Sequence, residues 1–286
     1  MTQPVAYLLE EFLESAEGRP IRILSEYLEP MRRFQDQKIQ DTVVFFGSAR
    51  VDSRERAERA MATLKARGVR VADQHYEIEL AKTRKALEWA RYYEDARELA
   101  RLLTTWSKTL VSENHRFVIT SGGGPGIMEA ANRGASEAGG KTIGLNIRLP
   151  FEQGANPYIT DGLHFEFHYF FMRKFWFAYL AKALVVFPGG FGTCDELFEI
   201  LTLVQTDKLS KKMDVVLYGS EYWKEVLRFE PMAEWGAIAD DDLALLHSAD
   251  SPFEAFEHLR ANLIANHLEP ATAQEAEAPG IAKTRG

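Results

Sequence analysis

The sequence predicts an α/β protein built on a Rossmann-like, doubly wound parallel sheet with helices on both faces. Short apolar runs of strand length alternate with longer segments of helical periodicity, which is the pattern of repeated strand–helix units. Two of these runs lead into glycine-rich turns, at 121–126 and 188–192, and a helical segment follows each turn. In a parallel sheet such turns lie at the carboxyl ends of the strands, where ligands bind.

The elements before the first glycine-rich turn are mostly helical. Residues 1–38 are polar, and we expect a helical lead-in that packs on the core or on another subunit. The first strand is expected at 43–46, followed by a small-residue turn at Gly47 and Ser48. Residues 54–88 carry mixed charges, which are typical of a solvated face, and are interpreted as a helical insertion. The helix that follows the first strand is expected at 92–103.

The later elements complete one nucleotide-binding domain, expected at 39–267. Further strands are expected at 117–120, 142–147, 163–167, 183–187 and 214–218. The tail at 268–286 is rich in Ala, Glu, Pro and Thr and lacks a hydrophobic face, so we predict that it is disordered.

Composition excludes several classes of protein. The net charge of -8 over 286 residues argues against bulk nucleic-acid binding, which needs a basic face. A single cysteine, Cys194, excludes an internal disulfide framework and a multi-cysteine metal site, and we expect neither metal nor cofactor. The N-terminus has no basic and apolar signal segment, and no apolar stretch is long enough to cross a bilayer. We therefore expect a cytoplasmic protein that does not contact membranes.

The second glycine-rich turn predicts a phosphate site. The first N–H groups of a helix have no intrahelical acceptor, and the helix dipole favours negative charge there. Gly189, Gly190 and Gly192 would let the backbone approach a phosphate, with Thr193 beside them. Thr193 and Glu196 also fit a capping box, in which the acid only stabilises the helix. Both interpretations stay open at this point.

An aromatic run at 169–177 contains two cations. Such a run is typical of a core helix, and its cations can snorkel to water. Arg173, however, carries the forked donor that suits a phosphate or a carboxylate. Lys174 is expected to point to solvent or to support the site.

Two better-known nucleotide motifs are excluded. Neither glycine-rich turn reads Gly-x-Gly-x-x-Gly, so the dinucleotide fingerprint is absent. Residues 135–142 resemble a P-loop, but they end a helix and open a strand, whereas a P-loop does the reverse.

Three motifs together resemble the LOG ("lonely guy") family. They lie at 121–132, 172–174 and 188–196, in the order and spacing of that family, and the resemblance runs from about Val43 to Tyr222. Members are nucleoside 5'-monophosphate phosphoribohydrolases, often mislabelled lysine decarboxylases. The chain length is similar to that of the longer bacterial branch.

The resemblance implies hydrolysis of the N-glycosidic bond of AMP or N6-substituted AMP, a cytokinin nucleotide, to free base and ribose 5-phosphate. It implies that Arg173 and Glu196 form the catalytic pair. Breaking this bond builds positive charge on the sugar, which an ionised carboxylate stabilises. The residues expected to bind the nucleotide are Gly47, Ser48, Gly123, Gly124, Glu129, Asn146, Lys174, Gly189, Gly190, Gly192 and Thr193. A decarboxylase would need a Schiff-base lysine beside a phosphate site of its own, and none is evident.

Two other functions remain open. The same fold could serve as a nucleotide-binding sensor without catalysis. It could also be an interaction protein that acts through residues 54–88. In each case we expect a homo-oligomer, at least a dimer, because the aromatic segment 165–179 exceeds what one small core needs.

Overall fold

A seven-stranded parallel sheet forms the centre of the computed structural model, which describes residues 4–67, 74–149, 154–209 and 211–268. The strand order is β4-β3-β2-β1-β5-β6-β7, and every neighbouring pair is parallel. The strands are β1 (Thr42–Phe46), β2 (Val118–Ser121), β3 (Thr142–Ile147), β4 (His164–Phe167), β5 (Ala181–Val186), β6 (Asp214–Tyr218) and β7 (Leu246–Ala249).

The strand order places one switch point in the sheet. The chain moves outward from β1 to β4 and then returns to the other side of β1 to form β5. The loops that leave β1 and β5 therefore diverge at the carboxyl edge, which is where doubly wound sheets bind ligands.

Helices cover both faces of the sheet, as expected. They are α1 (Glu10–Glu14), α2 (Arg19–Asp36), α3 (Arg54–Arg67), α4 (Gln74–Ser107), α5 (Ile127–Glu137), α6 (Phe170–Leu180), α7 (Phe191–Gln205), α8 (Ser220–Val226), α9 (Glu230–Glu234) and α10 (Pro252–His267), with short 3-10 turns η1 (Ala6–Leu8) and η2 (Asp240–Leu245). One core cluster joins the sheet to α2, α6, α7 and α8, and a second joins it to α4, α5 and α10. Alternate residues of β1 enter the two clusters, Val44 one and Phe45 the other. The Rossmann-like fold class is thus confirmed.

The six expected strands all form, and one more strand was not predicted. β7 carries the sequence Leu-His-Ser-Ala and is only partly buried at the edge of the sheet. A short edge strand with polar residues has no continuous apolar run, so periodicity does not reveal it.

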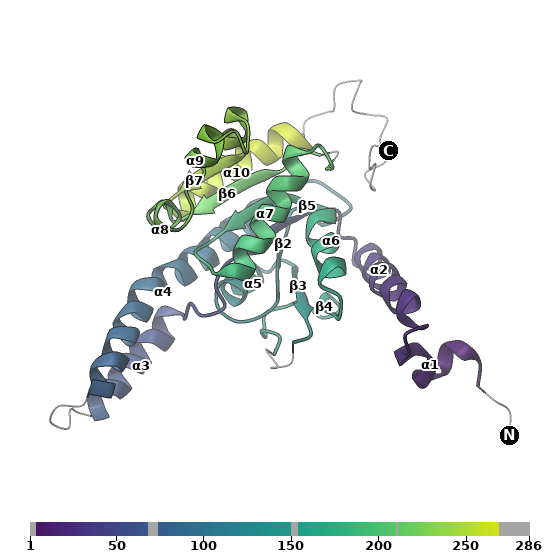
Figure 1. Ribbon diagram of the computed structural model, residues 1–286, viewed down its shortest axis with the longest axis horizontal. Coiled ribbons are helices and arrows are strands. Elements are labelled where there is room, and N and C mark those ends of the chain that lie inside the picture. The colour runs from purple at the N-terminus through teal and green to yellow at the C-terminus, as the bar shows by residue number, and fades with distance from the viewer. Residues whose placement is uncertain (1–3, 68–73, 150–153, 210, 269–286) are drawn as a thin grey trace.

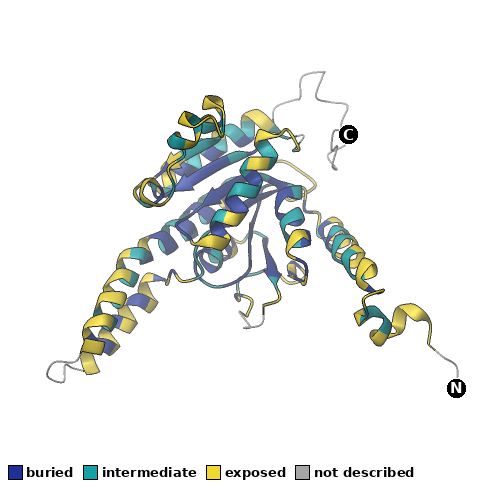
Figure 2. Ribbon diagram, in the orientation of Figure 1, coloured by how far each residue is buried: buried dark blue, intermediate teal, exposed yellow. Residues whose placement is uncertain are grey.

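The helix after β1 is longer than its predicted span of 92–103. α4 runs without a break from Gln74 to Ser107, so no structural boundary occurs at residue 88. Its first half pairs with α3, and the two helices project from the body with largely exposed surfaces (Figures 1 and 2). Charged residues surround this exposed half, which hides the continuity of the helix in the sequence pattern.

The N-terminal lead-in was expected to pack on the core or on another subunit. The second half of the lead-in packs on the core, because Phe34 of α2 meets the rings of Phe165 and Trp176 at centroid distances of 4.8 and 5.2 Å. The predicted disordered tail lies outside the described residues from 269 onward. No helix in the described ranges is long and apolar enough to cross a membrane. The domain limits and the interaction role of 54–88 stay predictions.

Candidate functional site

A cleft of about 930 Å³ opens at the switch point between β1 and β5. The turn after β1, the second glycine-rich turn, α6, α7 and α8 all contribute to its walls. The lining residues are Phe46, Gly47, Ser48, Ala49, Arg50, Trp89, Gly122, Met128, Arg173, Gly189, Gly190, Phe191, Gly192, Thr193, Cys194, Glu196, Tyr222, Val226 and Leu227. The cleft therefore brings together the turn after β1, the phosphate turn and the expected catalytic pair.

The N-terminus of α7 faces this cleft with open backbone donors. Gly190 is the N-cap and supplies no side-chain cap, and the N–H of Cys194 is the first to donate within the helix, to the oxygen of Gly190 at 3.0 Å. The N–H groups of Phe191, Gly192 and Thr193, here called the amide cradle, thus have no intrahelical acceptor. A Cβ added at Gly190 or Gly192 would meet no atom within 4 Å. The cradle has room for an anion.

The capping box does not form. The helix begins at Phe191, so Thr193 lies inside its first turn rather than at the cap. The Glu196 carboxylate turns toward α6 instead of the backbone, and Oε1 accepts from Nη2 of Arg173 at 2.8 Å.

Arg173 and Glu196 form a buried ion pair on the wall of the cleft. Their side chains are only 14% and 7% exposed. Burial raises the pKa of Glu196 to about 7, against the lowering effects of Arg173 and Lys174. Burial lowers the pKa of Arg173, although Glu196 and Asp195 oppose that shift. Nε of Arg173 is buried without a hydrogen-bond partner among the described residues, which leaves a donor for a ligand.

Lys174 lies outside the cleft and supports it. Its Nζ is 2.8 Å from Asp195 and 2.9 Å from Glu199, both on α7. Lys174 therefore ties α6 to α7 one residue away from Arg173.

The first glycine-rich turn is closed by contacts within the protein. Nδ2 of Asn156 donates to the oxygens of Gly123 and Gly124 at 3.0 and 3.1 Å. The N–H of Ile127, at the start of α5, donates to the oxygen of Ser48 at 3.2 Å. Of residues 121–126 only Gly122 lines the cleft, so Gly123 and Gly124 are not brought to it.

Glu129 and Asn146 also lie away from the cleft lining. Oε1 of Glu129 accepts from the Tyr93 hydroxyl at 2.7 Å and pairs with Arg56 at 2.9 Å, which braces α5 against α4 and α3. Asn146 is buried against Gly123, and its Oδ1 has no partner in the described part of the chain. The substrate contacts expected of both residues stay predictions.

Part of the cleft wall could not be found by motif. The rings of Trp89 on α4 and Tyr222 on α8 pack edge to face, with their centroids 5.6 Å apart. Val226 and Leu227 extend this apolar wall of the cleft. The Tyr222 hydroxyl donates to the oxygen of Gly189 at 2.7 Å and so holds the phosphate turn. Arg50 could have been found from the sequence, since it lies two residues after Ser48 in the turn that follows the first strand.

Neither metal nor thiol chemistry is indicated by the geometry. Within the described ranges, no group of three or more His, Cys, Asp or Glu residues could hold a metal ion. Burial raises the pKa of Cys194, which disfavours a reactive thiolate.

Two kinds of sequence comparison agree on the family. The family model described as "Possible lysine decarboxylase" matches residues 128–259. A cytokinin riboside 5'-monophosphate phosphoribohydrolase of Rhodococcoides fascians is 30% identical over 114 residues, which is 39% of this chain and 56% of that protein. The enzyme of the same name, LOG, of Oryza sativa subsp. japonica is 29% identical over 144 residues, or 48% of this chain and 56% of its own length. The chain thus spans just over half the length of these curated relatives.

Solved structures with related folds are more distant. The Moco carrier protein of Chlamydomonas reinhardtii is 19% identical with a TM-score of 0.46, and the match covers 79% of this chain and 99% of that one. The molybdenum cofactor binding protein of Rippkaea orientalis is 20% identical with a TM-score of 0.43, over 59% and 86% of the two chains.

Proposed function

Since this chain belongs to the LOG family, we propose that it is a phosphoribohydrolase that cleaves the N-glycosidic bond of a nucleoside 5'-monophosphate. The products are a free base and ribose 5-phosphate. The substrate is AMP or an N6-substituted AMP of the cytokinin type. Because nucleoside monophosphates are charged and retained inside cells, the activity belongs to the cytoplasm.

One observation carries the proposal. The buried Glu196 carboxylate lies one helical turn after the open amide cradle, and both line the same cleft. A phosphate on the cradle and a sugar reaching toward the carboxylate match the two ends of a ribose 5-phosphate unit. The helix dipole and unpaired N–H groups supply the phosphate site without any side-chain cation.

The chemistry follows from the charge that develops on the sugar. As the bond between C1' and the base nitrogen breaks, its electron pair leaves with the base and positive charge spreads over C1' and the ring oxygen. The ionised Glu196 carboxylate stabilises that charge more than it stabilises the neutral ground state. The same carboxylate orients a water whose oxygen forms the new bond to C1'. Glu196 accepts the proton that this water loses, and the departing base takes up one proton from solvent, so that the neutral free base and ribose 5-phosphate are formed.

Arg173 keeps the carboxylate in place. Its Nη2 holds Oε1 of Glu196, and the flanking rings of Phe170 and Phe177 lie 5.5 and 5.4 Å from the guanidinium carbon. The Lys174 bridges to α7 fix the spacing of the two helices. We assign the base to the apolar wall of Trp89, Tyr222 and Leu227, which suits an aromatic ring and an apolar N6 substituent.

A product assay tests the proposal. AMP, N6-isopentenyl-AMP and the other nucleoside monophosphates are incubated with the protein, and the released base is separated by chromatography. We expect release from a monophosphate and little from adenosine, which lacks the phosphate that the cradle binds. Glu196→Gln should release none while keeping its circular dichroism spectrum. Absence of release from every purine and pyrimidine monophosphate would refute the enzyme.

A nucleotide sensor is the alternative that the open cradle also supports. A cradle that binds phosphate needs no catalysis to be useful. Saturable binding of AMP without turnover, equal in the wild type and in Glu196→Gln, would select the sensor over the hydrolase.

A further inference from the structure

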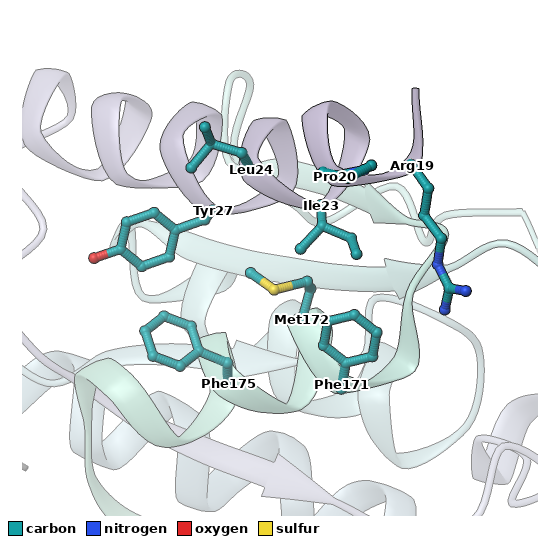
Figure 3. A pocket seen from close by; sticks show the side chains of 8 residues that line it. All are labelled: Arg19, Pro20, Ile23, Leu24, Tyr27, Phe171, Met172 and Phe175. Carbon is teal, nitrogen blue, oxygen red and sulfur yellow. The ribbon is translucent and has the colours of Figure 1, made fainter. Parts of the chain in front are cut away.

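An apolar groove of about 800 Å³ runs between α2 and α6 (Figure 3). Phe171 and Phe175 of the groove each lie two residues from Arg173 along α6, so they face a different side of this helix. Its lining residues are Arg19, Pro20, Ile23, Leu24, Tyr27, Phe171, Met172 and Phe175. Every one of them except Arg19 is apolar or aromatic. The two helices also pack through residues that do not line the groove, since the ring centroids of Phe34 on α2 and Trp176 on α6 lie 5.2 Å apart. The groove is therefore a feature of the folded body.

The N-terminal arm, residues 4–18, leaves the body at the mouth of this groove. It contains η1 and α1 and extends away from the sheet, with its surface largely exposed (Figures 1 and 2). Nη1 of Arg22 donates to the oxygens of Leu13 and Ser15, so α2 holds the end of α1 in this direction. The arm does not cover the groove of its own chain.

Exposed apolar side chains concentrate on the arm and on the helices that flank the groove. More than half of the exposed large apolar side chains in the described residues lie there, namely Val5, Tyr7, Leu8, Leu9, Ile21, Leu24, Leu28, Phe170 and Phe171. On the arm, Tyr7 and Leu8 are 71% and 68% exposed. Soluble monomers rarely leave so much apolar surface together, and such patches mark protein interfaces.

Charges on the two surfaces are complementary. The arm carries Glu10, Glu11, Glu14 and Glu17, and none of them forms an ion pair within the described part of the chain. Arg19 stands at the end of the groove and likewise forms no ion pair with a described residue. An acidic, apolar arm therefore suits a groove whose one charged lining residue is a cation.

We propose that the groove binds the N-terminal arm of a second copy of this chain, and that the exchange is reciprocal. Because the root of the arm adjoins the groove, a two-fold axis close to Gly18 and Arg19 places each arm on the groove of the other copy. Such an isologous arrangement closes as a dimer and leaves neither groove free. Residues 269–286 are a poor occupant, since Ile281 is their only large apolar side chain.

The dimer would also cover part of the helix that carries Arg173. Phe171 lines the groove, and the ring of Phe170 lies against the Arg173 guanidinium. Pairing would therefore hold α6 from the side opposite to the ion pair. The dimer itself does not depend on the proposed hydrolysis, and its test needs no substrate.

Light scattering coupled to size-exclusion chromatography measures the first consequence. The wild type should have the mass of a dimer at micromolar concentration, and the double variant Tyr7→Glu, Leu8→Glu should have the mass of a monomer. Both side chains are exposed within one chain, so the variant should stay folded and keep its circular dichroism spectrum. Trp235→Glu, at an 88% exposed position away from the arm, is the control and should stay dimeric. A monomeric wild type would overturn the proposal.

Cross-linking between differently labelled copies tests the arm itself. In a Cys194→Ser background, Tyr7→Cys protein is mixed with Phe171→Cys or Leu24→Cys protein and treated with a short bis-maleimide. We expect a covalent dimer of one arm variant and one groove variant, and none when Trp235→Cys replaces the groove variant. A dimer by mass that gives no arm-to-groove product would show that the two copies pair through another surface, which overturns the exchange.

Discussion

The loops after β2 and β5 both lead from a buried strand through glycines into a helix, but only the second leaves its helix N-terminus open. In the first loop, the N–H of Ile127 at the start of α5 donates to the oxygen of Ser48. The side chain of Asn156 donates hydrogen bonds to two carbonyl oxygens of this loop. In the second, the amide cradle faces the cleft without an acceptor among the described residues.

The glycines differ in the same way. A Cβ at Gly126 would lie 2.3 Å from the oxygen of Ser48, and one at Gly123 would overlap the side chain of Asn146. A Cβ at Gly192 would enter empty space. Gly123 and Gly126 are therefore required by packing, whereas Gly192 leaves room for a ligand. Two similar glycine-rich loops at one edge of a sheet can thus have different roles. The first loop packs against the protein and shapes the site, and the second leaves backbone donors open for a ligand.

The largest expected effect is on kcat, and it should distinguish Glu196, which follows the second loop, from Glu129, which follows the first. Glu196→Gln should lower kcat by roughly 10²–10⁴-fold, because the uncharged amide cannot stabilise the sugar cation or accept the water proton. Glu129→Gln should instead lower the free energy of unfolding by about 1–3 kcal/mol, since it weakens the buried contacts to Tyr93 and Arg56. Initial rates and urea unfolding measure both. If Glu129→Gln lost as much kcat at full stability, the first loop would also be catalytic.

A matched pair of glycine substitutions tests directly whether the first loop serves packing and the second serves ligand binding. Gly126→Ala should cost about 1–3 kcal/mol of stability, because φ is +71° there and the added carbon meets backbone. Gly192→Ala lies in the first turn of α7 and should leave stability unchanged or slightly higher, since alanine favours helix. Its methyl group should nevertheless raise KM by roughly tenfold, about 1.4 kcal/mol of lost binding. Equal losses of stability would remove the contrast.

The acid limb of the pH profile sharpens the assignment of Glu196. Burial raises its pKa to about 7, and the ionised form is the active one, so kcat/KM should fall as the pH drops below about 7. The free energy of unfolding should depend on pH in the opposite direction to kcat/KM. The folded-state pKa lies above the ordinary value of 4.5, so unfolding free energy falls as the pH rises from about 4.5 to about 7. A rate that rises on acidification would mean that Glu196 acts as a protonated acid.

The smallest expected effect is on KM, when the hydrogen bond from Tyr222 to the second glycine-rich turn is removed. Tyr222→Phe removes only the hydrogen bond to the oxygen of Gly189 and should cost about 0.5–1.5 kcal/mol, seen as a two- to twelvefold rise in KM. Asn156→Ala removes both side-chain hydrogen bonds to the first loop and should lower the melting temperature with a smaller change in KM. Titration with a non-hydrolysable nucleotide gives the binding change separately from turnover.

Local patterns in the sequence were sufficient for six of the seven strands of the described sheet and for the two glycine-rich loops, whereas the pairing of Arg173 with Glu196 was implied only by the resemblance to the LOG family. Each of these strands and loops depends on residues close together in the chain, so strand length and helix-start signals reveal them. The apolar wall was missed because Trp89 and Tyr222 meet only in the folded protein, from helices more than a hundred residues apart. The closure of the first loop was missed for the same reason, since Asn156 reaches Gly123 across 33 residues.

A crystal structure of the Glu196→Gln protein with AMP tests the central claim most directly. The account predicts that the phosphate lies within hydrogen-bond distance of the N–H groups of Gly192 and Thr193, with C1' facing the carboxamide at residue 196. A phosphate bound instead at the start of α5, or a residue 196 turned away from the ribose, would contradict it.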